Sequence, residues 1–150
     1  MDWFSKAFLK SSLVWLGIGV SLGALMASVP ALTVYRTAHL HLNMLGFVSM
    51  MIFGVAYHVI PRFMGHPLHA FRLAALHVWL ANAGLASLAL GFLLMPTIGP
   101  RAVPLQAAGG VLSAVGAYLF IYNMWRTLDG RRAPRRTRPG ATLLPTLADE

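Results

Sequence analysis

Long apolar stretches separated by single charged residues dominate the sequence. Four stretches contain no Lys, Arg, Asp or Glu, namely 11–35, 37–61, 73–100 and 102–125. Each is long enough to cross the hydrocarbon core of a bilayer as a helix, which takes about 20 residues. The pattern therefore predicts an all-α protein built as a transmembrane bundle of four helices.

The composition supports a membrane protein over a water-soluble one. Hydrophobic residues make up 57% of the chain and charged residues only 11%, where soluble domains carry about 25% charged residues. Lys6 and Lys10 precede the first apolar stretch, so a cleavable secretory signal is an alternative there. The stretch stays apolar as far as Leu32, which favours a retained helix.

The distribution of basic residues predicts the orientation. If the N-terminus is inside, all twelve Lys and Arg except Arg36 and Arg101 fall on the inner side. Cytoplasmic segments carry the excess of Lys and Arg, so both termini are expected to be cytoplasmic. We predict a multi-pass protein of the inner (plasma) membrane of a prokaryote.

Two segments are expected along the chain. Residues 1–128 form the predicted transmembrane domain, and residues 129–150 form a cytoplasmic tail rich in Arg and Pro. Such a tail has little apolar surface to bury and suits the anionic inner leaflet. The expected partner is therefore the lipid bilayer and not a nucleic acid. Glycines lie within the apolar stretches, where they allow close helix packing; they include Gly19, Gly23, Gly46, Gly54, Gly109 and Gly116.

Histidine is the residue that offers chemistry. The chain has six His and no Cys, and no Asp or Glu lies in the four stretches. Imidazole is a good ligand for iron, copper and zinc. His39 and His41 are two residues apart, which places them about 200° apart around a helix axis. They cannot hold one ion together, but they can serve two separate clefts, as axial haem ligands would. Bonds to neighbouring carbonyls or waters are the alternative role.

His58 and His77 lie at a different depth from this pair. Counting the rise along two antiparallel helices places His77 about 8 Å deeper than His58. We predict that they make hydrogen bonds between helices, and a second haem or metal site is the alternative.

A set of motifs resembles the catalytic subunit (subunit I) of the haem-copper oxidases. The sequence A-H-L-H at 38–41 resembles the start of that family's tenth helix. The sequence L-H-V-W at 76–79 resembles the start of its eleventh helix, and G-P-R at 99–101 resembles the loop that follows. The further matching positions of the tenth helix are Gly46, Phe53–Gly54, Tyr57–His58, Pro61–Phe63 and Gly65. The NnrS proteins are a related family.

The resemblance implies roles for individual residues. His39 matches the axial ligand of the high-spin haem, and His41 matches one axial ligand of the low-spin haem. Arg101 matches an arginine that pairs with haem propionates, and Arg36 is a further candidate for that role. The cofactor that we predict is haem b, with His39 and His41 as the ligands of the iron and no catalytic residue assigned.

The resemblance also implies what is missing. The family has about twelve helices and a copper centre, and this chain lacks the copper ligands and the second imidazole of the low-spin haem. Because the twelve helices form three arcs of four, the resemblance suggests a homotrimer in which His39 of one subunit faces His41 of the next, with a dimer as the alternative. We predict electron transfer with a redox partner, O2 or NO binding, or both; a non-enzymatic accessory or assembly subunit without haem is the alternative.

Overall fold

The computed structural model describes residues 1–130, and this part of the chain is helical with short turns. Its long helices are α1 (Trp3–Ser28), α4 (Phe71–Ile98) and α5 (Val103–Leu128). Between α1 and α4 the chain forms the 3₁₀ helix η1 (Pro30–Tyr35), α2 (Arg36–His41), the π-helix η2 (Leu42–Ser49) and α3 (Met50–Phe63). The 3₁₀ helix η3 (Gly99–Ala102) joins α4 to α5.

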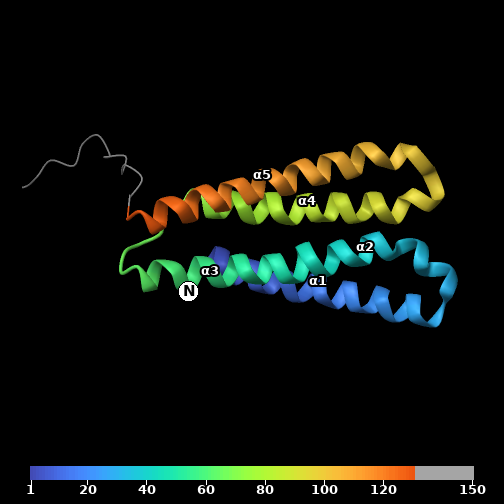
Figure 1. Cartoon of the computed structure of the whole chain (residues 1–150), viewed down its shortest axis with the longest axis horizontal. Helices are drawn as coiled ribbons and strands as arrows, with labels where there is room; N and C mark the ends of the chain where they lie inside the picture. Colours follow the sequence, from blue (N-terminus) through green and yellow to red (C-terminus); the bar gives the residue numbers. More distant parts are fainter. Residues whose placement is uncertain (131–150) are drawn as a thin grey trace, which may run out of the picture.

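The helices form two antiparallel hairpins that lie side by side (Figure 1). In one hairpin α1 packs along the continuous rod of α2, η2 and α3, and in the other α4 packs along α5. The turns η1 and η3 lie at one end of the molecule, which we call the Arg36 end. The loop 64–70 and both ends of the described chain lie at the other, which we call the His66 end.

The prediction of four transmembrane helices is wrong in its helix count. Residues 1–130 contain five α-helices, and three continuous helical segments are long and apolar enough to cross a membrane: Trp3–Ser28, Pro30–Phe63 and Phe71–Leu128. The prediction divided the chain at charged residues. Around Arg101, however, α4, η3 and α5 follow one another without a residue outside a helix, so Phe71–Leu128 counts as one segment, although the chain reverses its direction at Gly99, whose φ is 58°. The all-α class holds for the described residues, and the basic tail lies outside them from residue 131 onward.

The second apolar stretch is also not one regular α-helix. Its middle is the π-helix η2, in which the Ser49 hydroxyl donates a 2.9 Å hydrogen bond to the Met44 carbonyl, five residues back. Gly46 sits in this segment between the two hairpins. A Cβ there would lie 2.6 Å from Cβ of Trp15 and 2.8 Å from Cδ2 of Leu85. The absence of a side chain therefore lets the π-helix fit between α1 and α4.

Aromatic residues fill the core toward the His66 end. Phe8 is fully buried, and its ring centroid lies 4.7 Å from that of His77 and 5.8 Å from that of Phe53. Phe4 packs edge-on against Tyr57 at 5.5 Å. These contacts join α1, α3 and α4 through dispersion and ring geometry.

The loop at the His66 end is tied to α5 by polar side chains. The Asn123 side chain makes two 3.0 Å hydrogen bonds with the backbone of Ala70, donating to its carbonyl and accepting from its amide. The Thr127 hydroxyl accepts a 3.0 Å bond from the amide of His69. Both side chains are buried, so these bonds satisfy backbone groups where the chain enters α4.

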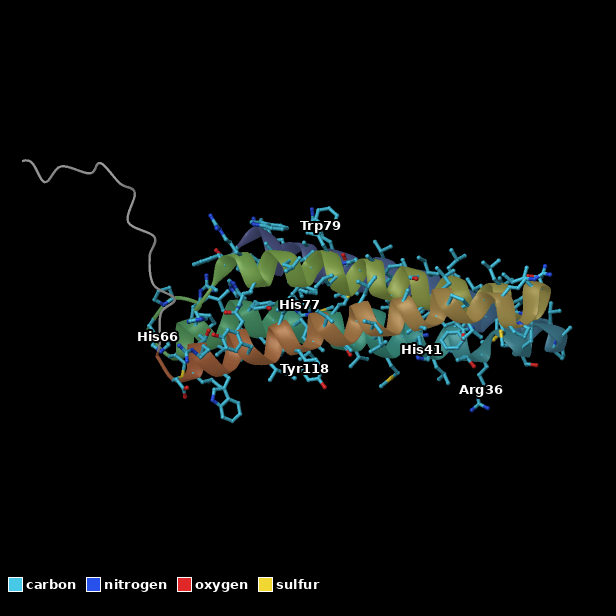
Figure 2. All side chains as sticks on the ribbon, turned by 90° about the horizontal axis from the view of Figure 1, so that it is seen from above. Arg36, His41, His66, His77, Trp79 and Tyr118 are labelled. Carbon is cyan, nitrogen blue, oxygen red and sulfur yellow. The ribbon has the colours of Figure 1, made fainter. Side chains whose placement is uncertain are left out.

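The outer surface of the helices is apolar, as expected for contact with lipid. Trp79 is 70% exposed and Tyr118 is 71% exposed, and both project outward from the helices (Figure 2). Large exposed apolar side chains also occur on α1 and on α3, such as Val14 and Ile52. Exposed apolar surface of this extent marks a membrane-embedded or partner-facing protein. Together with the three apolar helical segments, it indicates a membrane protein.

Candidate functional site

His39 lies in α2 with its ring packed against α1. Its Nδ1 is 2.8 Å from the carbonyl oxygen of Gly19. Because a carbonyl only accepts, Nδ1 carries the proton in this bond. A Cβ at Gly23 would lie 2.7 Å from Cε1 of His39, and a Cβ at Gly19 would lie 2.7 Å from Nδ2 of Asn43, so the two glycines form a notch that admits the imidazole and the amide beside it. The small residues of α1 thus serve this side chain as well as helix packing.

Asn43 supports His39 from one turn further along the chain. Its Nδ2 donates a 2.8 Å hydrogen bond to the backbone carbonyl of His39. Nothing in the sequence analysis pointed to Asn43. Its spacing of four residues from His39 was the available signal, because residues i and i+4 are neighbours on a helix.

His41 faces a different neighbour. Its Nδ1 lies 2.8 Å from the carbonyl oxygen of Thr37 on its own helix, and its ring centroid is 4.8 Å from that of Phe92 on α4. The labelled ring lies toward the Arg36 end of the molecule (Figure 2). One imidazole therefore lies against α1 and the other against α4, as the spacing of two residues predicts.

The two histidines share a hydrogen-bonding pattern. In each ring Nδ1 is bonded to a backbone carbonyl, which fixes the tautomer and leaves the lone pair on Nε2. Within the described residues, Nε2 of His39 and Nε2 of His41 are not buried atoms left without a hydrogen-bond partner. Protein histidines that bind metals almost always have their second nitrogen held in this way. The geometry is therefore suited to two ligands that act at separate places.

Arg36 and Arg101 both lie at the Arg36 end. Arg36 is the first residue of α2, one turn before His39, and Arg101 lies in η3. Both side chains are exposed, and within residues 1–130 neither makes a hydrogen bond or an ion pair. They are available to an anionic group outside this part of the chain.

The structure separates His58 from His77. His77 is fully buried on α4, with its Nδ1 3.1 Å from the hydroxyl of Tyr57, while Nδ1 of His58 lies 2.8 Å from the guanidinium of Arg62. The predicted interhelical bond is confirmed for His77 but not for His58, which bonds within α3. Within the described residues, no three His, Asp or Glu side chains converge on one point.

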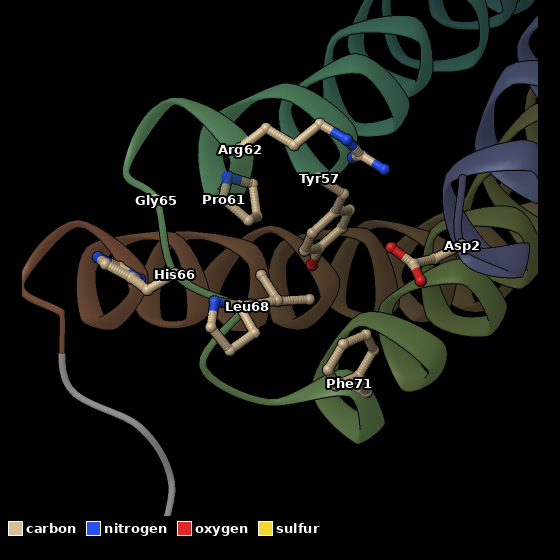
Figure 3. A pocket seen from close by; sticks show the side chains of 9 residues that line it. Asp2, Tyr57, Pro61, Arg62, Gly65, His66, Leu68 and Phe71 are labelled. Atoms are coloured by element: carbon tan, nitrogen blue, oxygen red, sulfur yellow. The ribbon is translucent and has the colours of Figure 1, made fainter.

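A pocket of about 350 Å³ lies at the His66 end of the molecule (Figure 3). Asp2, Arg62 and His66 contribute polar groups to it, and Tyr57 and Phe71 contribute rings. His66 therefore lines a pocket. The pocket contains neither His39 nor His41, so it is a separate feature.

A match to a known protein family shows to which family the chain belongs. The family described as Cytochrome C and Quinol oxidase polypeptide I matches residues 4–144. The chain belongs to this family. The resemblance to the catalytic subunit of the haem-copper oxidases is thereby confirmed. The matched region includes all four residues predicted for the site, namely Arg36, His39, His41 and Arg101.

Two bacterial relatives extend the comparison. The Cbb3-type cytochrome c oxidase subunit CcoN1 of Stutzerimonas stutzeri is 26% identical over 155 residues, a region that covers 83% of this chain and 33% of the relative. The cytochrome c oxidase subunit 1 of Rhodobacter capsulatus is 27% identical over 121 residues, which is 64% of this chain and 23% of the relative. The chain thus spans a third or less of the length of these relatives.

Proposed function

We propose that the protein is an integral membrane module that binds haem b through His39 and His41. The hydrogen bonds from both Nδ1 atoms to backbone carbonyls carry this proposal, because they present Nε2 of each ring as the ligand atom. Bound haem iron would supply one-electron redox chemistry and, if one axial position is open, a place for a gas ligand. The chain's own contribution is to hold and orient the imidazoles in an apolar setting.

The directions of the two rings support a haem shared between subunits. His39 lies against α1 and His41 lies against Phe92 of α4, so the two rings lie against different helices. An iron with two imidazole ligands then takes one from each of two chains. We propose a ring-shaped homotrimer in which His39 of one subunit pairs with His41 of the next, with a dimer as the alternative.

The two exposed arginines suit the anionic part of the cofactor. Arg36 and Arg101 have no partner within the described residues, and they lie at the same end of the molecule as the histidine pair. A guanidinium binds a carboxylate through two parallel hydrogen bonds. We assign both residues to the haem propionates.

The proposed activity is electron transfer, binding of O2 or NO, or both. Two bacterial relatives are named as cytochrome c oxidase subunits, which supports a redox setting and a redox partner. Because the chain covers a third or less of each relative, we do not extend the activity of the whole oxidase to it. The bacterial relatives and the apolar helices support a place in the inner (plasma) membrane of a prokaryote.

An absorption spectrum of the purified protein tests this function. We expect the reduced-minus-oxidised difference spectrum to show the bands of a b-type haem. Added CO should change the spectrum if the iron has an open position, and should leave it unchanged if two imidazoles hold the iron. A protein that stays colourless after haem is supplied would refute the proposal.

The colourless result would instead favour a non-enzymatic accessory or assembly subunit. One observation supports this second candidate: the notch at Gly19 and Gly23 already accommodates the His39 ring within the chain. In that case the histidines only join helices, as polar side chains do in membrane proteins.

The glycine notch gives a prediction for haem binding. In Gly23→Ala, the new Cβ would lie 2.7 Å from Cε1 of His39 and displace the ring, so we expect the haem content per chain to fall about tenfold, as losses of supporting contacts to metal ligands do. Gly17→Ala is the matched control, because no atom lies within 4 Å of its new Cβ. Equal haem content in the two variants would show that the notch does not position His39.

A further inference from the structure

The pocket at the His66 end contains opposite charges that do not pair with each other. Its volume is about 350 Å³, and Asp2 and Arg62 line it together with the rings of Tyr57 and Phe71 (Figure 3). Within the described residues, the carboxylate and the guanidinium form no ion pair with each other. The pocket therefore offers a ligand one negative group, one positive group and an aromatic wall.

The carboxylate of Asp2 has no partner in the described part of the chain. Asp2 directly precedes α1, a position where an Asp side chain usually accepts a hydrogen bond from a backbone N–H of the first turn. The Asp2 side chain makes no such bond, and it forms no other hydrogen bond within residues 1–130. Its oxygen atoms are therefore available to a ligand that donates hydrogen bonds, such as an ammonium group.

Arg62 presents a guanidinium that is held at one nitrogen and available at the others. Its Nη1 donates to the backbone carbonyl and to Nδ1 of His58. These bonds orient the side chain and leave the N–H groups of Nε and Nη2 for a ligand, and a guanidinium binds phosphate oxygens through parallel hydrogen bonds. Asp2 and Arg62 both act electrostatically on the ring of His58, so the two charged groups lie on the same part of the surface.

The pocket lies at the level where lipid headgroups meet a membrane protein. Each of the three apolar helical segments begins or ends at this end of the molecule (Figure 1). Trp3 and Trp125 are exposed near these helix ends, and tryptophan side chains are enriched at the headgroup level of a bilayer. A lipid headgroup can therefore reach the pocket without leaving the membrane interface.

The charges and the position of the pocket define the class of ligand. A phosphate group suits the guanidinium, and a nearby primary ammonium group suits the carboxylate and the aromatic rings. We propose that the pocket binds the headgroup of a phosphatidylethanolamine lipid, with its phosphate at Arg62 and its ammonium group at Asp2. The proposal does not depend on haem, because the pocket contains neither His39 nor His41.

Native mass spectrometry of the intact protein in detergent tests this site. The probes are phosphatidylethanolamine and phosphatidylcholine with the same short acyl chains, which both lack net charge, although only the ethanolamine lipid has N–H groups to donate. We expect the ethanolamine lipid to bind about fivefold more tightly, the upper range for an ion pair at a surface. Asp2→Asn should remove this preference. Arg62→Gln should weaken the binding of both lipids about fivefold and keep the preference.

Asp129→Asn and Arg72→Gln are the matched controls, because both residues are exposed near the same helix ends and neither lines the pocket. Both controls should bind the two lipids as the wild type does. Equal affinity of the wild type for the two lipids would overturn the proposal. A preference that survives in Asp2→Asn, or that is lost in Asp129→Asn as well, would also overturn it.

Free O-phosphoethanolamine distinguishes a lipid from a soluble source of the same headgroup. We expect it to bind more weakly than the lipid, because the acyl chains of the lipid also contact the apolar helices. Equal affinity would overturn the assignment to a membrane lipid. All four variants should keep the haem content of the wild type, so a failure here is distinguishable from a failure of the proposed function.

Discussion

Replacing His41 with Ala is expected to abolish six-coordinate haem in the protein. The variant loses one of the two proposed axial imidazoles, so the haem content per chain should fall at least tenfold, and any haem retained should bind CO. In the wild type, the ring of Phe92 lies 4.8 Å from the His41 ring and restricts its orientation. The variant loses this contact as well. The measurement is haem per chain, with the absorption spectrum recorded before and after CO is added.

His58→Ala is the matched control for this experiment. His58 lies on the same continuous helical segment, and its Nδ1 is bonded to Arg62 in the same segment. Its loss should leave haem content at the wild-type level. A His41 variant with an unchanged spectrum would remove His41 from the proposed ligands.

Mixing two variants tests whether the haem is shared between subunits. Chains with His39→Ala retain His41, and chains with His41→Ala retain His39. In a ring that pairs His39 of one subunit with His41 of the next, co-expressed variants form some clefts with both imidazoles intact. We expect the mixture to recover part of the six-coordinate spectrum that each variant lacks alone. If it recovers none, the haem is not shared between His39 of one subunit and His41 of the next.

Replacing Gly109 with Ala is expected to have the largest effect on stability. Gly109 lies where α4 and α5 approach most closely, and a Cβ there would overlap the backbone nitrogen of Leu88 and lie 2.6 Å from the carbonyl oxygen of Gly84. Backbone atoms cannot rotate away as a side chain can, so the two helices must separate. Overpacking of this kind costs about 3 kcal/mol. Thermal unfolding of the purified protein in detergent measures this loss.

The neighbouring residue provides the control. Gly110 has no atom within 4 Å of a new Cβ, and Ala is the better helix former. Gly110→Ala should therefore be as stable as the wild type or slightly more stable. If both variants unfold at the same temperature, the contact between α4 and α5 does not depend on Gly109.

The sequence predicted where long helical segments lie better than it predicted helix breaks or contacts. Apolar stretches located the helical segments because burial in lipid requires long runs without charge. Charge alone did not reveal how the segments are joined, so the helix count was wrong at Arg101, where η3 links α4 to α5 through the turn at Gly99 without a residue outside a helix. The π-helix was also missed, because the residues of 42–49 differ little in kind from those of the helices around them.

The site illustrates the same limit. The spacing of His39 and His41 predicted two directions, and the structure places the rings against two different helices. Counting the rise along the helices put His58 near His77, but rise gives depth and does not give the direction around the axis. The residue that reaches His77 is Tyr57, one position earlier. Asn43 and Phe92 became part of the site only when the helices were packed together.

The wide turn at 42–49 lies inside the helical segment Pro30–Phe63. A π turn takes up an extra residue compared with an α turn, so the side chains beyond it are rotated relative to those before it. The part before the turn can therefore direct His39 and His41 toward α1 and α4, and the part after it can direct Tyr57 toward His77. The extra residue of the π turn therefore lets one helical segment contact two sets of neighbours. A uniform α-helical repeat would not direct its side chains toward both sets.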